Sequence, residues 1–360
     1  MLIDRFDLNA FQSAVTTHEL QDAVARSCME GSYPSIDAAR WKQMQAAIAD
    51  VDADHGLFLQ LDSVQLSLAL RRRVANDATV SGILFKPTVH YREAPSVRAW
   101  LRDIRKSVLY RAMMLHPDLS TVFSLDPYFA TFAQEHFHRG DITRFLPDPV
   151  PADSSAAEHP PPGFWTRNRV VFLLFGYLSR RKGLLTLMEA VTHLPPSHQA
   201  RTSVILAGSF EPEIKQEFDR LLRLVQKNAP DLHIRIVDRF IEQQELSDWV
   251  SHADVVLAPY QNAVGSSGVV LWAAMKQTPL LTQSYGLIGR YVNEYGLGKT
   301  VDTTDPQAIA QSMSDFIQVH ASNRARAPSD NDFEDAKRSF LERHSPDNFG
   351  RVLLEELSTG

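Results

Sequence analysis

The chain has 360 residues, of which 44% are hydrophobic and 22% charged, and its formal net charge is −6. This length accommodates two domains with separate cores, and the negative charge argues against a nucleic-acid partner. Cys28 is the single cysteine of the chain, which excludes an intramolecular disulfide and fits a reducing compartment.

The N-terminus carries no sign of a targeting segment. The first residues, MLIDRFDLNAFQ, include acidic side chains and no apolar core, unlike a signal peptide. No run of about 18 apolar residues predicts a membrane span, so we expect a cytoplasmic protein. Basic residues on one predicted helix leave peripheral attachment to a membrane open, with an ordinary solvated helix face as the favoured interpretation: Arg98, Arg102, Arg105 and Lys106.

Residues 1–150 alternate between apolar runs and helical spacing, which predicts an N-terminal Rossmann-like domain. Residues 8–50 have a helical pattern that is broken near Gly31–Pro34. Strands and helices then alternate, with strands expected at 55–61, 79–85, 119–125 and 142–146 and helices at 63–75, 96–115 and 126–137. Proline and small polar residues dominate the next segment, and residues 151–167 are predicted to be an interdomain linker.

Residues 168–335 show a cleaner alternation. The run RVVFLLF at 169–175 is apolar throughout, as expected for a strand of a parallel sheet that is covered on both faces. Such an alternation predicts a doubly wound sheet that binds its ligand at the carboxyl ends of the strands. The strands are expected at 169–175, 202–207, 233–237, 254–258 and 280–282, and the helices at 184–194, 211–228, 244–252, 267–276, 289–295 and 306–320.

Three loops at the carboxyl ends of these strands have the composition of a phosphate site. The loop 176–183 contains Arg180, Arg181 and Lys182 between two glycines and opens a helix, so a diphosphate is its expected occupant. The loops 259–268 and 283–289 offer hydroxyls and backbone N–H groups at further helix starts. Each loop alone also fits a purely structural role, since glycine, lysine and capping serine are common at such junctions.

The order of motifs over about 150 residues resembles the nucleotide-sugar domain of the GT-B glycosyltransferases, specifically the large retaining family 4. The resemblance implies an α/β fold of two Rossmann-like domains with the active cleft between them. The C-terminal segment 336–360 resembles the helices that cross back to the first domain in this family. The matching segments are FGYLSRRKG (175–183), VILAG (204–208), HADVVLAPY (252–260), GSSGVVLWAAMKQTPLL (265–281) and YGLIG (285–289).

The resemblance also implies roles for individual residues. His90 would hydrogen-bond the donor sugar, and Lys182 would stabilise the charge of the leaving diphosphate. The base of the nucleotide would lie near 239–245. The remaining donor-binding residues implied by the family pattern are Gly176, Arg180, Arg181, Gly208, Phe240, Tyr260, Gly265, Ser266, Ser267, Gly268, Tyr285 and Gly286.

The expected function is transfer of a sugar from a UDP-, GDP- or ADP-sugar to an acceptor hydroxyl, with retention, in polysaccharide, glycolipid or glycoside biosynthesis. The acceptor is not identified, and the sequence leaves a protein partner and homo-oligomerisation open. No cofactor is expected. A metal is not required because the cationic loop and helix starts can take its electrostatic place, and Asp50, Asp52 and Asp54 are interpreted as solvated helix caps rather than ligands.

Three departures from the family pattern motivate an alternative. Trp272 and Val264 stand where the family has two glutamates, and Tyr177 stands where it often has arginine. Only about 55 residues precede the first predicted strand, so the N-terminal domain is expected to be shortened. The alternative is a catalytically degenerate homologue that acts as a partner-binding subunit. A dinucleotide-dependent oxidoreductase ranks lower, because no Gly-x-Gly-x-x-Gly follows a first strand.

Overall fold

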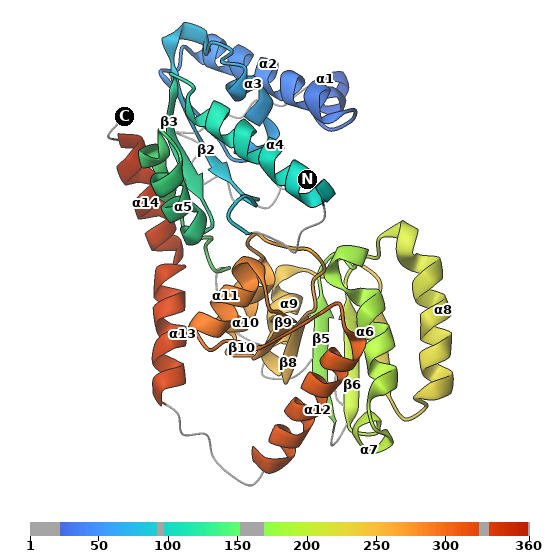
Figure 1. Cartoon of the computed structure of the whole chain (residues 1–360). Helices are drawn as coiled ribbons and strands as arrows, with labels where there is room; N and C mark the ends of the chain where they lie inside the picture. Colours follow the sequence, from blue (N-terminus) through green and yellow to red (C-terminus); the bar gives the residue numbers. More distant parts are fainter. Residues whose placement is uncertain (1–21, 92–96, 152–168, 324–330, 359–360) are drawn as a thin grey trace. The chain divides into compact units, whose positions relative to one another are not determined.

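The computed structural model describes residues 22–91, 97–151, 169–323 and 331–358, and it forms two compact units (Figure 1). The first unit comprises Met1–Gly82 with Ser107–Ser120, and the second comprises Ile83–Lys106 with Thr121–Gly360. The linker predicted at 151–167 lies outside the described residues except for Pro151. Within the described ranges, no helix combines the length and apolar character needed to cross a membrane.

The first 150 residues contain a four-stranded sheet in the order β1-β2-β3-β4. The pairing of β1 with β2 and that of β3 with β4 are parallel. The strands are β1 (His55–Phe58), β2 (Thr79–Leu84), β3 (Leu119–Ser124) and β4 (Thr143–Phe145). The helices are α1 (Asp22–Ser27), α2 (Tyr33–Val51), α3 (Gln65–Ala69), α4 (Val97–Met114) and α5 (Pro127–His136), with 3₁₀ turns η3 (Leu61–Ser63), η4 (Ala75–Asp77) and η5 (Gly140–Ile142).

The predicted helix over 63–75 is wrong in length. Helix α3 ends at Ala69, and the chain then turns through Arg71, Asn76 and Asp77, all with positive φ. These left-handed residues interrupt helical hydrogen bonding. The Arg72 N–H still donates to the carbonyl of Ser67 in α3, at 3.3 Å. Beyond it, the N–H of Val74 donates to the side chain of Asp118 at 3.4 Å and that of Ala75 to the side chain of Gln45 at 2.5 Å. The apolar residues of this segment are therefore buried by several short turns rather than by one helix face.

The second part of the chain forms a six-stranded parallel sheet in the order β10-β9-β8-β5-β6-β7. Its strands are β5 (Val170–Phe175), β6 (Thr202–Ala207), β7 (His233–Val237), β8 (Val255–Ala258), β9 (Leu280–Gln283) and β10 (Gly298–Val301). Strand β10 was not predicted, and the other five confirm the expected alternation. The strand order changes direction between β5 and β8, so the crevice for a ligand is expected where these two strands end.

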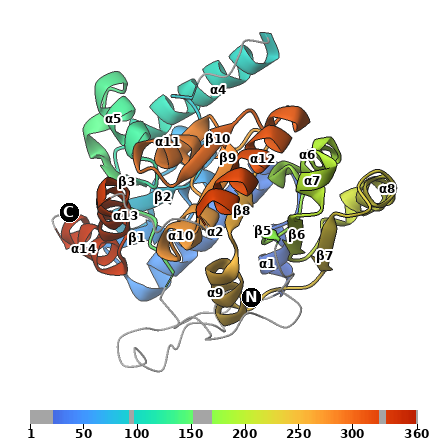
Figure 2. The ribbon, with the colours of Figure 1, turned by 90° about the horizontal axis from the view of Figure 1, so that it is seen from below.

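Helices cover both faces of this sheet (Figures 1 and 2). They are α6 (Leu184–Ala190), α7 (Pro196–Gln199), α8 (Pro212–Asn228), α9 (Gln243–His252), α10 (Gly268–Met275), α11 (Gly286–Glu294), α12 (Pro306–Asn323) and α13 (Asn331–Arg343), with 3₁₀ turns η6 (Arg180–Lys182) and η7 (Val191–His193). The last helix, α14 (Pro346–Ser358), is joined to β4 by an ion pair between Glu356 and Arg144 at 2.8 Å.

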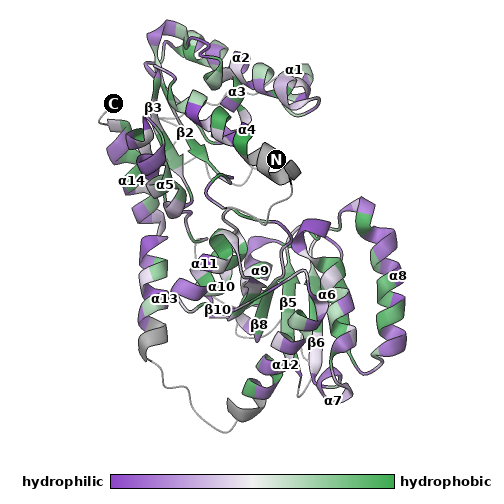
Figure 3. Cartoon of the chain, in the orientation of Figure 1, coloured by the Kyte–Doolittle hydropathy of each residue, from purple (hydrophilic) through white to green (hydrophobic). Residues whose placement is uncertain are grey.

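Alternate residues of β5 point to the two halves of the core. Leu173 packs in one cluster with residues of α9, α10, α11 and α13, including Trp249 and Phe340. Phe172 packs in the other with residues of α6, α8 and α12, including Phe218. Strand β5 is buried at every position, and its apolar colour contrasts with the alternating colours of α8 (Figure 3). This burial on both faces explains why the sequence of β5 is apolar at every position.

Candidate functional site

The three phosphate-type loops meet at the change of strand order. The loop after β5 and the loop after β8 are joined by a hydrogen bond from the Gln261 N–H to the Arg181 carbonyl, at 2.7 Å. The loop after β8 and the start of α11 are joined by a bond from the Leu287 N–H to the Val264 carbonyl, at 3.0 Å. The structure therefore brings together, at one edge of the sheet, the loops that the sequence analysis selected.

Two glycines allow the backbones after β5 and β6 to approach each other. Gly176 has φ +91° and Gly208 has φ +144°, values that favour glycine. A Cβ at Gly208 would collide with the carbonyl of Gly176, and a Cβ at Gly176 would lie 2.6 Å from Nζ of Lys182. Glycine is therefore required at both positions by close packing: Gly208 packs against the backbone of Gly176, and Gly176 packs against the side chain of Lys182.

Lys182 is buried although it carries a charge. Its side chain is 6% exposed, and its ammonium donates to the carbonyl of Phe175. Burial, reinforced by the positive charge of Arg181, lowers the pKa of Lys182 from 10.5 to about 8. The ammonium lies 5.6 Å from the ring centre of Tyr260. Among the described residues, no carboxylate forms an ion pair with Lys182.

The two arginines of the same loop differ in their surroundings. Arg180 points away along the surface, where it forms an ion pair with Glu217 of α8 at 2.5 Å. The guanidinium of Arg181 lies 5.2 Å from the ring centre of Tyr260 and, within the described part of the chain, has no carboxylate partner. Arg181 and Lys182 are therefore the cations of this loop whose charges are not compensated locally.

The start of α10 carries the hydroxyl groups that the sequence analysis selected. Ser267 caps α10 by accepting a bond from the Val269 N–H, and its hydroxyl lies 3.0 Å from that of Tyr260. The hydroxyl of Ser266 donates to Asp148 at 2.6 Å. Burial raises the pKa of Asp148, an effect that this hydrogen bond opposes. Gly268 is exposed at the first position of α10, and Gly265 is half-buried.

The remaining residues predicted for the donor lie on neighbouring loops. Gly286 begins α11 with φ +71°, and a Cβ there would lie 2.8 Å from the carbonyl of Ala263. Tyr285 precedes it and is half-buried. Phe240 follows β7 at the sheet edge and is 55% exposed. Near it, Arg239 and Glu245 form an ion pair at 2.6 Å that lowers the pKa of Glu245.

Trp272 is part of the core. It is 8% exposed and packs in the cluster formed by α9, α10 and α11. An indole N–H is a donor only, so Trp272 offers no acceptor for a ribose diol. Val264 is half-buried in the loop before α10 and offers only backbone polar groups. The positions of the two expected glutamates therefore supply no carboxylate to this site.

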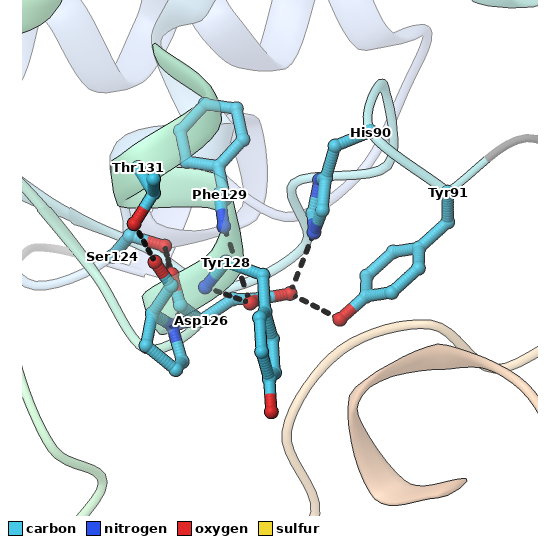
Figure 4. Close-up of polar contacts among 8 residues, drawn as sticks. His90, Tyr91, Ser124, Asp126, Tyr128, Phe129 and Thr131 are labelled. Carbon is cyan, nitrogen blue, oxygen red and sulfur yellow. Dashed lines mark hydrogen bonds and ion pairs between the residues drawn. The ribbon is translucent and has the colours of Figure 1, made fainter. Parts of the chain in front are cut away.

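His90 lies in a separate cluster that is built around Asp126 (Figure 4). One carboxylate oxygen of Asp126 accepts from His90 Nε2 at 3.0 Å and from the Tyr91 hydroxyl at 2.7 Å. The other oxygen caps α5 by accepting from the N–H groups of Tyr128 and Phe129. The side chain of His90 is 4% exposed, and none of the described residues forms a hydrogen bond with its buried Nδ1. Burial, with Asp126 nearby, raises the pKa of Tyr91.

Asp126 was not predicted as a site residue from the sequence. The available signal was the pair Asp126-Pro127 directly after a strand, which is typical of a helix N-cap. His90 also lines a pocket of about 270 Å³, and the other lining residues are Tyr128, Thr131, Phe132, Glu135 and Arg290. Across the described ranges, no group of three or more His, Cys, Asp or Glu side chains could hold a metal ion.

Comparison with known proteins supports the interpretation of the second part of the chain. Residues 169–318 match the family model described as "Glycosyl transferases group 1". A D-inositol 3-phosphate glycosyltransferase from Xylanimonas cellulosilytica is 28% identical over 188 residues. That alignment covers 49% of this chain and 41% of the length of the relative.

Solved structures support the architecture of the chain. A sucrose-phosphate synthase from Thermosynechococcus elongatus has a TM-score of 0.66 at 16% identity, over 91% of this chain and 79% of that one. The Anabaena protein HepE, solved with UDP and glucose, has a TM-score of 0.62 at 16% identity, over 92% of this chain and 84% of that one. The chain therefore has the α/β GT-B fold, and its residues 169–318 are similar to the glycosyl transferases group 1 family.

Proposed function

We propose that this protein transfers a sugar from a nucleoside diphosphate sugar to an acceptor hydroxyl, with retention at the anomeric carbon. The observation that carries the proposal is the pair of cations Arg181 and Lys182. Both lie against Tyr260 where β5 ends, and no carboxylate among the described residues neutralises them. Two uncompensated cations at the change of strand order suit an anionic group such as a diphosphate.

The same arrangement suits the chemistry of glycosyl transfer. Negative charge develops on the diphosphate as the bond to the sugar breaks, and fixed positive charges near it lower the barrier. Lys182 and Arg181 would supply these charges, and the first N–H groups of α10 would add hydrogen bonds. The two cations are placed before the donor arrives, so little reorganisation is needed during the reaction.

The rest of the donor would extend from this point along the sheet edge. We place the base near Phe240, which follows β7 and is 55% exposed. His90 would contact the donor sugar. No described residue pairs with its buried Nδ1, and a buried polar atom without a hydrogen bond raises the free energy of the folded state. A hydrogen bond between Nδ1 and the sugar would remove that cost. We infer that the 1–150 region serves the acceptor and that the product belongs to polysaccharide, glycolipid or glycoside biosynthesis.

The test is donor turnover by the purified protein. UDP-, GDP- and ADP-sugars are incubated with the protein, and release of the nucleoside diphosphate is measured. Lys182→Ala should lower the rate by about a hundredfold or more, as expected when a donor to the leaving group is removed. Lys299→Ala serves as the matched control, because this lysine is exposed and pairs with Asp315 on another face. Equal rates for Lys182→Ala and the wild type would remove Lys182 from the mechanism.

One observation favours a second candidate, a partner-binding homologue without activity. Trp272 occupies a position where the family pattern has a donor-binding glutamate, and it is buried in the core. A thermal-shift screen separates the two functions, because a ligand that binds the folded state raises Tm. A shift with any nucleoside diphosphate supports the transferase. No shift with UDP, GDP or ADP or with their sugars would favour the partner-binding function.

A further inference from the structure

Tyr260 connects the two loops that would hold the donor phosphates. It follows β8, is 1% exposed, and lies between the cationic loop after β5 and the start of α10. We propose that Tyr260 is a positioning residue, which does not contact the donor but fixes Arg181, Lys182 and Ser267 in one arrangement suited to a diphosphate. This inference rests on the proposed function, because it assigns a task within the same site.

The ring of Tyr260 faces the two cations. The guanidinium of Arg181 and the ammonium of Lys182 lie 5.2 and 5.6 Å from the ring centre. The face of an aromatic ring attracts cations, and the attraction is strongest where water is excluded. The ring can therefore hold two like charges near each other without neutralising them. A carboxylate in the same place would compete with a phosphate, whereas a neutral ring does not.

The hydroxyl of Tyr260 acts on the second loop. It lies 3.0 Å from the hydroxyl of Ser267, which is the N-cap of α10. Burial raises the pKa of Tyr260, so the phenol keeps its proton and stays a neutral partner of the serine. One side chain thus contacts the cationic loop with its ring and the helix cap with its hydroxyl.

The backbone of Tyr260 is itself held firmly. Its N–H donates to the carbonyl of Ala258 at 2.7 Å, and its carbonyl accepts from the hydroxyl of Thr303 at 2.7 Å. The carbonyl of Thr303 in turn accepts from the side chain of Gln261 at 2.5 Å. Because the backbone, ring and hydroxyl of Tyr260 all have partners, its side chain can keep the two loops that it contacts at a fixed position relative to each other. Removing the hydroxyl should loosen the cap while leaving the ring in place.

The experiment compares diphosphate and monophosphate affinity by calorimetric titration. The ligands are UDP, GDP and ADP, each set against its own monophosphate. Tyr260→Phe should weaken binding of the diphosphates about three- to tenfold, the range for one lost hydrogen bond, and leave the monophosphates within about twofold. Ser267→Ala should weaken diphosphate binding at least as much, because it also removes the N-cap of α10. The double variant should be no weaker than Ser267→Ala, because the serine change already breaks the contact with Tyr260.

The control is Tyr291→Phe, which removes the hydroxyl of another buried tyrosine, one that has no hydrogen-bond partner in the described structure. Its affinities should equal those of the wild type, and all variants should keep Tm within a few degrees. If the wild type binds none of the three diphosphates, the proposed function fails. If it binds one of them while Tyr260→Phe binds equally well, or if the two variants are additive, the positioning role of Tyr260 is wrong.

Discussion

A buried lysine without a carboxylate partner lowers the stability of the folded state, and Lys182 is such a residue. The pKa of Lys182 falls from 10.5 to about 8 on folding. That difference corresponds to a free-energy cost on the order of 3 kcal/mol for burying the charged form. The cost is fully present below pH 8, where both states carry the proton. Between pH 8 and 10.5 the unfolded state binds more protons, so the free energy of unfolding rises with pH.

Lys182→Met should therefore stabilise the protein while it removes donor binding. At pH 7 we expect the free energy of unfolding to increase by about 1 to 3 kcal/mol, because an apolar chain replaces a buried charge. The advantage over the wild type should shrink as the pH approaches 10.5. Urea denaturation at pH 7 and at pH 10 measures it. A variant that is less stable than the wild type at pH 7 would show that the charge is satisfied in the folded protein.

Some site residues could be predicted from the sequence and others could not. Arg181 and Lys182 lie in a short basic loop between two glycines, so their neighbourhood depends on local chain order. The roles of Tyr260 and Asp126 depend on long-range contacts, with Arg181 of the loop after β5 and with His90 respectively. No spacing in the sequence encodes these contacts, because they arise only when separate strands end side by side.

At the scale of the element, the strands with continuous apolar runs could be predicted well. Strands β5, β6 and β8 are buried at every position. A strand made mostly of apolar residues is stable in water only when both faces of its sheet are covered, so its place inside a parallel sheet can be predicted. Strand β10 was missed because its four residues, Gly298–Val301, are exposed or half-buried at the sheet edge. Helix α3 was predicted too long because the turn at Arg71 has no glycine or proline to mark it.

The junction of β5, β6 and their loops should be intolerant of a side chain at Gly208. Gly208→Ala forces a Cβ against the carbonyl of Gly176 and a φ of +144° on alanine. We expect a loss of about 2 kcal/mol or more in stability and a loss of donor binding, because the loop after β5 must move. Urea denaturation and nucleotide titration measure the two effects.

Gly350→Ala is the matched control for this change. A Cβ at Gly350 meets no atom within 4 Å, and the residue lies inside α14. Alanine should stabilise the protein there by about 0.5 to 1 kcal/mol, since glycine is a poor helix former. If Gly208→Ala were as stable as the wild type, the close approach of the two loops would not be needed for folding.

At the level of the whole molecule, the proposed donor site lies in one part of the chain. Residues 169–318, which match the glycosyl transferases group 1 model, contain the parallel sheet, its change of strand order and the two uncompensated cations. The three loops at the carboxyl ends of its strands are joined by backbone hydrogen bonds, so they lie together at one edge of the sheet. We propose that this edge of the sheet binds the diphosphate of a nucleotide sugar.

Calorimetric titration of UDP, GDP and ADP into the wild type and into an Arg181→Ala, Lys182→Ala double variant tests that claim most directly. We expect the wild type to bind at least one nucleotide and the double variant to bind it about a hundredfold or more weakly, because two charge-assisted contacts are removed. If the double variant binds as tightly as the wild type, or if the wild type binds none of the three nucleotides, this edge is not the diphosphate site.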